Sequence, residues 1–352
     1  MTKSALILGG TGQIGRAAAA RLLAEGWAVT LASRSGNGAP HELTAAGARM
    51  ARFERNDDAS LAALLANGTD ALIDTIAFDK THADQLLKVQ SDVGTLVVIS
   101  SIAVYCDSQG RNLDEAGEPG TFPIILESIP ETHPTVRPGS ATYASRKMAM
   151  EETLLERSRR PLFILRPGAI HGVGSKHPRE WWFVKRLLDG RRRIPLAYGG
   201  ALGLHTAAAV NIASLISTVL PLKSTIILNA VDPAPPTVLD IGQQLAGLLR
   251  RDVDFIGLAV SDSQSPVGAT PWSLPVPFIA SDASAKALGY APAASYRSAI
   301  EPLCDWLVAT AADGDWRARF PIMAASGHDP FDYRAEDDLL GLLTGGDTSA
   351  AR

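Results

Sequence analysis

Short apolar runs alternate with amphipathic or alanine-rich runs through the first half of the chain. The apolar runs predict β-strands at residues 5–8, 28–32, 71–75, 96–100 and 162–166, with a further short strand before Glu54. The runs between them predict helices at residues 14–25, 59–66, 83–89 and 148–157. Strands that alternate with helices are typical of parallel β-α-β units in a doubly wound sheet. The strand at 96–100 is almost wholly apolar, as expected when helices cover both faces of the sheet.

The pattern becomes less regular after about residue 170. Helices are expected at residues 180–188, 211–220, 237–250 and 298–309, and a strand at 226–231 is expected to return to the main sheet. Two long segments rich in proline and glycine, 107–142 and 261–277, show little periodicity. Loops of that length in compact domains are usually functional lids or disordered. The predicted fold is therefore α/β, with a smaller C-terminal domain partly interleaved with the first.

Composition excludes several classes of protein. The chain has 352 residues, of which 46% are hydrophobic, enough for a large core, and its net charge of −4 gives no electrostatic footprint for nucleic acid or an anionic membrane. Two cysteines, Cys106 and Cys304, are too few for a disulfide framework and suit a reducing compartment. The apolar run near the N-terminus is too short for a signal peptide, and no stretch approaches the roughly 20 apolar residues of a membrane span. We expect a cytoplasmic protein that does not enter a membrane.

A glycine-rich segment, Gly9-Gly10-Thr11-Gly12-Gln13-Ile14-Gly15, lies between the first predicted strand and the first helix. Glycines at this junction permit a tight turn, let the main chain approach a pyrophosphate and let the helix pack on the strand. The helix N-terminus then attracts the negative charge. A plain glycine-rich turn is the alternative. The context favours a dinucleotide-binding loop, with Gly9, Thr11, Gly12, Gln13, Ile14 and Gly15 as its binding residues.

Two further positions bear on the dinucleotide. Ser33 and Arg34 end the second strand, where an acid would bind the ribose of NAD and an arginine can accommodate the 2′-phosphate of NADP. NADP is therefore the expected cofactor and NAD the alternative, unless Arg34 is only a solvated surface residue. Asp57 follows the third strand. It could contact the adenine or simply cap the next helix, and the sequence leaves both interpretations open.

Tyr143 and Lys147 are spaced i, i+4, which places them on one face of a helix. A lysine ammonium close to a phenol stabilises the phenolate and lowers the tyrosine pKa, so the tyrosine can exchange a proton with a substrate oxygen. Ser101, at the end of the fourth long strand, could hydrogen-bond the same oxygen. The hypothesis is that Ser101, Tyr143 and Lys147 are catalytic; simple surface pairing of the tyrosine and lysine is the alternative.

Together these residues resemble the extended branch of the short-chain dehydrogenase/reductase superfamily, which contains the NAD-dependent epimerases and dehydratases. Ser101-Ile102-Ala103-Val104-Tyr105 is similar to the family's Ser-x-x-Val-Tyr segment, and Leu165–Gly172 is similar to its Leu-Arg-x-x-x-Val-Tyr-Gly segment. A Gly289-Tyr290-Ala291-Pro292 segment resembles the usual C-terminal ending, so the resemblance spans roughly residues 4–310. It implies a Rossmann-type sheet and further cofactor contacts from Ala77, Ser100, Tyr143, Lys147, Pro167, Ala169 and Ile170.

The domain boundaries follow from this resemblance. Residues 1–170 are predicted to form the dinucleotide-binding domain, with 205–235 returning to it. Residues 171–343 are predicted to be mainly substrate-binding, and the small polar tail, 344–352, to be frayed. The family's helices also imply a homodimer. No His/Cys cluster or HExxH motif is present, so no metal site is expected.

Three departures from the family pattern indicate an atypical subgroup. The span from Ser101 to Tyr143 is longer than usual, Asn211 stands where the family has an aspartate, and Cys106 replaces a glycine. The long loop and the region around Asp57 also look similar to the chloroplast stem-loop-binding-like group. Because of these departures, the family's sugar-nucleotide epimerase chemistry does not follow directly for this chain.

The function expected from these features is an NAD(P)-dependent oxidoreductase or epimerase acting on a hydroxyl- or carbonyl-bearing small molecule, with a sugar or nucleotide sugar as the natural candidate. The alternative is a non-enzymatic dinucleotide-sensing regulator or RNA-associated protein on the same fold, because fold alone does not decide function. A scaffold that binds nothing is disfavoured by the glycine loop.

Overall fold

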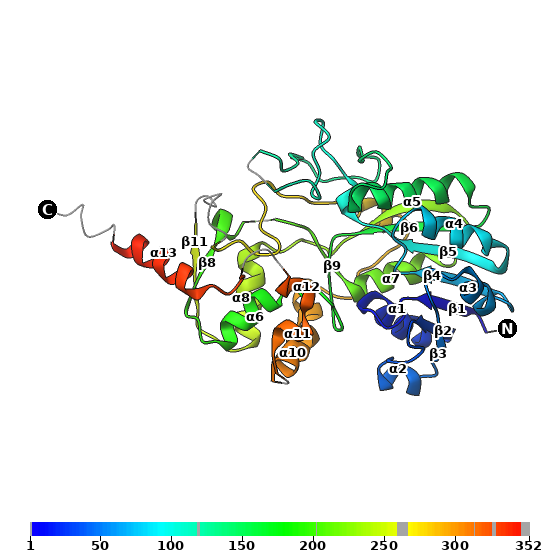
Figure 1. Cartoon of the computed structure of the whole chain (residues 1–352), viewed down its shortest axis with the longest axis horizontal. Helices are drawn as coiled ribbons and strands as arrows, with labels where there is room; N and C mark the ends of the chain where they lie inside the picture. The colour runs from blue at the N-terminus through cyan, green and yellow to red at the C-terminus, as the bar shows by residue number, and fades with distance from the viewer. Residues whose placement is uncertain are drawn as a thin grey trace.

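Seven parallel strands of the described chain form one central sheet in the computed structural model (Figure 1). Their order across the sheet is β3 (Arg49–Arg52), β2 (Ala28–Ser33), β1 (Ser4–Leu8), β4 (Thr69–Asp74), β5 (Val93–Ile99), β6 (Leu162–Pro167) and β10 (Thr225–Ala230). The structure describes residues 2–117, 120–201, 203–258, 267–312, 314–325 and 329–345. The predicted doubly wound α/β fold is confirmed.

The direction of strand winding reverses between β1 and β4, which pair in parallel from Ala5↔Ala71 to Leu8↔Asp74. In open α/β sheets the crevice at such a switch point, beyond the carboxyl ends of the strands, is where ligands bind. The segment after residue 205 contributes β10, which pairs with β6 from Thr225↔Leu162 to Ala230↔Pro167. The sheet therefore fixes both the place of the candidate site and the return of the later chain to the first domain.

Helices cover both faces of the sheet. One face is covered by α1 (Gln13–Ala24), α2 (His41–Ala45) and α7 (Ala209–Val219), and the other by α3 (Asp58–Leu64), α4 (Lys80–Lys88) and α5 (Tyr143–Arg157). Small residues on α1 let this helix pack close to its neighbours, since its own Ala18 and Ala19 are completely buried. This double cover explains why the central strands are apolar on both faces.

A second hydrophobic core lies at the other end of the molecule (Figure 1). It is built from α6 (Trp181–Leu188), α8 (Val238–Leu248), α10 (Tyr296–Ala312), α11 (Trp316–Arg319), α12 (Pro321–Ala324) and α13 (Tyr333–Gly345), beside the two-stranded pair β8 (Arg193–Leu196) and β11 (Asp254–Gly257). Trp181, Trp182 and Phe183 are all buried in it. Shorter elements are β7 (Ala169–His171), β9 (Thr206–Ala208), α9 (Ala283–Ala287) and the 3-10 turns η1 (Gln90–Asp92), η2 (Ile102–Val104) and η3 (Ala197–Gly200).

The largest difference from the expected boundaries is at α5, which begins at Tyr143 rather than at residue 148. The cause is a capping box, in which the Thr142 hydroxyl accepts from the Ser145 backbone and the Ser145 hydroxyl accepts from the Thr142 backbone. Such reciprocal caps satisfy two orphan amide donors of the first turn. At the other end of the chain, α13 continues to Gly345, and residues 346–352 of the expected frayed tail lie outside the described residues.

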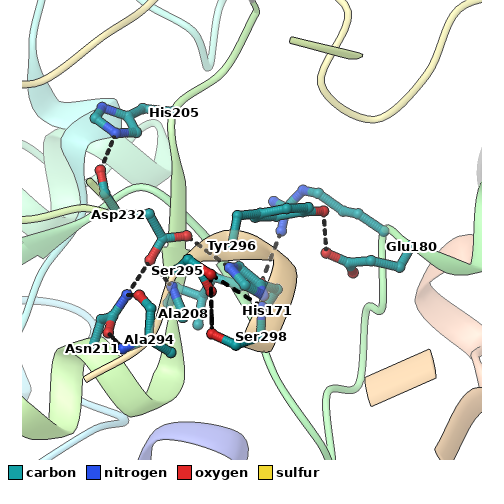
Figure 2. Close-up of polar contacts among 12 residues, drawn as sticks. His171, Glu180, His205, Ala208, Asn211, Asp232, Ala294, Ser295, Tyr296 and Ser298 are labelled. Carbon is teal, nitrogen blue, oxygen red and sulfur yellow. Dashed lines mark hydrogen bonds and ion pairs between the residues drawn. The ribbon is translucent and has the colours of Figure 1, made fainter. Parts of the chain in front are cut away.

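Asp232, just beyond β10, ties the two parts of the chain together (Figure 2). Its side chain lies 2.8 Å from His171 Nε2 and accepts hydrogen bonds from the Ala208 amide at 2.7 Å and from Asn211 Nδ2 at 2.8 Å. Its main-chain carbonyl lies 2.8 Å from His205 Nε2. A single carboxylate therefore holds β7, β9 and the start of α7 in place. No helix in the described part of the chain is long and apolar enough to span a bilayer.

Replacing this carboxylate is expected to destabilise the fold. Burial alone would raise the pKa of Asp232, but the hydrogen bond and charge of His171 lower it to about 2. Because the folded pKa lies below the ordinary 3.8, the stabilisation is present above pH 3.8 and is lost as the pH falls through 2. We expect Asp232→Asn to lower the free energy of unfolding by about 3 kcal/mol at pH 7, and by less near pH 3. Urea denaturation at the two pH values measures both.

The matched control is Asp84→Asn, which removes a carboxylate from an exposed cluster with Lys80 and Arg157. Surface pairs are worth about 0–1 kcal/mol, so this variant is expected to stay close to the wild type. Equal losses for the two variants would show that the buried cluster is no more important than a surface pair.

Candidate active site

A cavity of 560 Å³ opens at the carboxyl ends of the sheet strands. Its walls come from the loops after β1, β4, β5 and β6, from the start of α5 and from the segment that precedes α6. The lining residues are Gly9, Gly12, Gln13, Ile14, Thr75, Ile76, Ser100, Ser101, Ile102, Ala103, Leu113, Asp114, Tyr143, Pro167, Gly168, Ala169, Ile170, Gly174, Ser175, Lys176, His177, Arg179 and Leu204. The predicted glycine loop and the predicted tyrosine thus share one cavity, although more than 120 residues separate them in the sequence.

The glycine loop is shaped by close contacts. Gly9 has a φ of +76°, in the left-handed region that favours glycine. A Cβ at Gly15 would lie 2.6 Å from Gly10 Cα, and one at Gly10 would lie 2.8 Å from the Leu31 side chain. These two glycines therefore let α1 approach the sheet. Gly12 differs, because a Cβ there would meet only the Gly9 carbonyl, at 3.3 Å.

The N-terminus of α1 fits an anion. Gly12 is its N-cap, the first turn holds no acidic residue, and no described side chain caps the exposed amides. Such amides, together with the helix dipole, favour a phosphate group. Four of the six predicted loop residues, Gly9, Gly12, Gln13 and Ile14, line the cavity. Gly15 lies behind the loop, and the Thr11 carbonyl accepts a hydrogen bond from Arg16 Nε at 2.7 Å.

Tyr143 reaches the cavity from the first turn of α5 and keeps 39% of its surface exposed. The Ser101 side chain lies beside the phenol and lowers its pKa. Ser101 caps η2, where its hydroxyl accepts from the Ala103 amide at 3.1 Å. Desolvation raises the pKa of Tyr143, whereas Ser101 and the charge of Arg179 lower it, and Asp114 raises it further. The structure therefore brings the predicted serine and tyrosine into the same cavity.

Lys147 lies one turn along α5, and its ammonium points to the sheet rather than directly to the phenol. Its Nζ donates to the carbonyls of Ala77, at 2.6 Å, and Ile99, at 2.9 Å, and lies 5.8 Å from the centroid of the Tyr143 ring. Burial lowers the pKa of Lys147 to about 8, although the carboxylates of Asp74 and Glu151 oppose the shift. The spacing predicts that Lys147 lowers the pKa of Tyr143, but the groups that mainly shift this pKa are Ser101, Asp114 and Arg179, together with burial.

A buried network of Ser100, Glu151 and Arg166 lies behind the cavity wall. The Ser100 hydroxyl donates to Glu151, which forms a buried ion pair with Arg166 at 2.5 Å. Ser100 therefore lines the cavity while its hydroxyl is engaged elsewhere. Of the other predicted cofactor residues, Pro167, Ala169 and Ile170 line the cavity. The Ala77 carbonyl accepts a hydrogen bond from Lys147 Nζ.

Ser33, Arg34 and Asp57, also predicted to bind the cofactor, lie away from the cavity lining. Ser33 ends β2 and donates to the Asn37 carbonyl at 3.2 Å, while Arg34 beside it is exposed. Asp57 caps α3, accepting from the Ala59 amide at 2.9 Å. The capping interpretation of Asp57 thus has a direct contact in the structure, and the arginine lies at the edge of the sheet where the ribose of a dinucleotide would be held.

Sequence patterns did not identify two charged residues of the cavity. Asp114, from the long loop, accepts a hydrogen bond from the Ala144 amide at 2.5 Å and so sits at the N-terminus of α5. Arg179 precedes α6 and lines the opposite part of the cavity. Neither belongs to a periodic run or a spaced motif, so only the tertiary structure reveals them.

Comparisons with known proteins agree with this geometry. Residues 9–179 match a family model described as NAD(P)H-binding. The UDP-glucose 4-epimerase of Stenotrophomonas maltophila, solved with NAD and formylated UDP-arabinopyranose, has a TM-score of 0.67 and 17% identity, covering 89% of this chain and 100% of its own. The UDP-glucose 4-epimerase of Thermotoga maritima with UDP-glucose has a TM-score of 0.66 and 14% identity, covering 88% and 99%.

The dTDP-glucose 4,6-dehydratase of Bacillus anthracis in complex with NAD has a TM-score of 0.63 and 14% identity, covering 88% of this chain and 98% of its own. No curated protein sequence matches the chain significantly. The resemblance to the extended short-chain dehydrogenases is thereby confirmed for the fold and for an NAD(P)H-binding domain.

Two glycines of the loop are expected to respond differently to substitution. Gly12→Ala places a methyl group where the pyrophosphate approaches, so we expect NADPH affinity to fall about tenfold with less than about 1 kcal/mol lost in unfolding free energy. Gly15→Ala forces a Cβ against Gly10, which is expected to cost about 1–3 kcal/mol of stability. Fluorescence titration and urea denaturation measure the two effects.

Gly247→Ala in α8 is the control, because a Cβ there would meet only Arg297 Nη1, at 3.7 Å. Unchanged NADPH affinity in Gly12→Ala would show that the pyrophosphate does not approach this position.

Proposed function

We propose that this chain, which has an NAD(P)H-binding domain at residues 9–179 and the fold of nucleotide-sugar epimerases and dehydratases, is an NADP(H)-dependent oxidoreductase or epimerase. Its substrate is a small molecule that carries a hydroxyl or carbonyl group. The observation that carries this proposal is that Ser101 and Tyr143 line the same cavity as the uncapped N-terminus of α1, with Ser101 close enough to lower the pKa of the phenol. The cavity thus combines an anion-binding helix end with a proton-exchanging phenol.

Three side chains of the protein have separate roles at the substrate oxygen. A bound nicotinamide cofactor supplies hydride transfer to or from the substrate carbon. Tyr143 gives a proton to the substrate oxygen, or takes one from it, as that carbon is reduced or oxidised. Ser101 hydrogen-bonds the same oxygen and stabilises the charge that develops on it. Lys147 keeps its positive charge below about pH 8 and places it at the carboxyl edge of β4 and β5, behind the phenol.

The edge of the sheet supports NADP as the preferred cofactor. Arg34 follows β2, and Arg52 ends β3 at the position paired with Ser33. Both arginines are exposed, and neither forms an ion pair with a carboxylate in the described parts of the chain. Guanidinium groups bind phosphate through parallel hydrogen bonds, so two unpaired arginines at this edge favour the 2′-phosphate of NADP.

Removing the phenol hydroxyl tests the catalytic proposal. We expect Tyr143→Phe to lower kcat by about 10²–10⁴-fold, because it removes the proton donor, while NADPH affinity stays within about twofold. Over a panel of nucleotide sugars, sugar phosphates and hydroxy acids, net oxidation or reduction is followed by nicotinamide absorbance, and epimerisation by chromatography of the product. Tyr290→Phe, a buried tyrosine remote from the cavity lining, is the matched control and is expected to keep full activity. A wild-type protein that binds NADPH but turns over no member of the panel would favour a dinucleotide-sensing regulator instead.

Removing Arg34 tests the cofactor preference. The wild type is expected to bind NADPH more tightly than NADH, and Arg34→Ala is expected to weaken NADPH binding about tenfold while leaving NADH binding almost unchanged. Arg49→Ala, an exposed arginine at the opposite end of β3, is the control. Tighter binding of NADH by the wild type would contradict the NADP preference and leave the enzymatic proposal intact.

A further inference from the structure

Arg179 is a half-buried cation in the wall of the cavity. Its one hydrogen bond within the described residues runs from Nη1 to the Ile170 carbonyl, at a long 3.5 Å. The guanidinium has five N–H donors, so most of them have no partner among the described residues. Burial lowers the pKa of Arg179, and the charges of Glu180 and Tyr143 oppose that shift. A half-buried charge with no carboxylate partner among the described residues, lining a cavity, is a candidate ligand-binding group.

The fully buried arginines of the described chain, unlike Arg179, each form an ion pair with a carboxylate. Arg166 pairs with Glu151 at 2.5 Å, and Arg186 pairs with Glu336 at 2.6 Å. Each of these guanidinium groups therefore has a carboxylate that neutralises it. Arg179 forms no ion pair with any described carboxylate, although it lies in a cavity where an outside anion can reach it.

Two carboxylates that influence this part of the cavity, Glu180 and Asp114, hydrogen-bond other groups. Glu180 is its neighbour in sequence, but its side chain turns to the hydroxyl of Tyr296, at 3.3 Å (Figure 2). Asp114, in the same cavity, accepts the Ala144 amide at the start of α5. The cavity wall next to Arg179 adds further positive or donor groups, Lys176 and His177. The wall is therefore complementary to an anion that the chain does not itself provide.

We propose that Arg179 anchors an anionic group of the substrate, a carboxylate or a phosphate ester, beside the reacting carbon at Tyr143. The proposal rests on the proposed function, because Tyr143 marks the reacting carbon. The charge of Arg179 is felt at the Tyr143 phenol, so an anion bound by the guanidinium would lie close to the oxygen that exchanges a proton. The substrate class is thus a small hydroxy or oxo acid or a sugar phosphate, and a neutral polyol lacks the group that the arginine requires.

The anion could instead belong to the cofactor, and binding experiments separate the two sources. Malonate, inorganic phosphate and the neutral analogue malonamide are titrated by calorimetry into the full chain saturated with NADPH. We expect malonate or phosphate to bind, malonamide not to bind, and Arg179→Gln to weaken the anion at least tenfold while NADPH affinity stays within twofold. Arg157→Gln, which removes an exposed arginine at the far end of α5, is the control and is expected to match the wild type.

Arg179→Lys provides a second variant that retains the charge but loses the planar fork. It is expected to bind the anion about three- to tenfold more weakly than the wild type, between the wild type and Arg179→Gln. Equal anion binding by all three proteins, or none by the wild type, would overturn the anchor while normal NADPH binding leaves the proposed function standing. A loss of NADPH affinity in Arg179→Gln equal to the loss of anion affinity would assign the arginine to the cofactor and also overturn the proposal.

Discussion

The hydrogen bonds of one buried carboxylate, Asp232, determine how the cavity is built. They join the exit of β10 to β7 and to the start of α7, and β7 leads directly into the segment that carries Arg179. The family resemblance implied an aspartate at position 211, where this chain has Asn211. The structure shows Asn211 donating to Asp232, so the carboxylate comes from the following strand and the amide supplies the donor. The exchange keeps a buried negative charge next to His171, which needs an acceptor for its ring nitrogen.

The periodic pattern was sufficient for the sheet and its helices, because apolar runs and amphipathic faces are local properties of the sequence. It failed at the start of α5, where two polar side chains, Thr142 and Ser145, complete the first turn by bonding each other's backbone. It also failed for Asp114 and Arg179, which lie in irregular segments. Their positions depend on where distant loops meet at the carboxyl ends of the strands, and no local spacing encodes that meeting.

Lys147 illustrates the same limit within a correctly identified motif. An i, i+4 spacing places a lysine on the face of its tyrosine, but the direction of a long side chain depends on its partners. Here the carbonyls of Ala77 and Ile99 at the sheet edge attract the ammonium, since a buried charge needs hydrogen bonds from fixed groups. The pKa of the phenol is instead lowered by Ser101 and by the charge of Arg179, which line the same cavity. Spacing therefore predicts which residues share a site more reliably than which residues touch.

The charges behind the cavity alternate in sign from the protein interior outward. Asp232 is paired with His171; His171 and Glu180 influence each other's ionisation, and Glu180 does the same for Arg179. Arg179 is the last charge of this row, and it lines the cavity. If Arg179 anchors the substrate as proposed, the charge of the cavity wall, and not the fold shared with nucleotide-sugar enzymes, selects what binds. An anionic substrate would complete the alternation at the point where the phenol exchanges its proton, and so couple recognition of the charge to the position of the reacting oxygen.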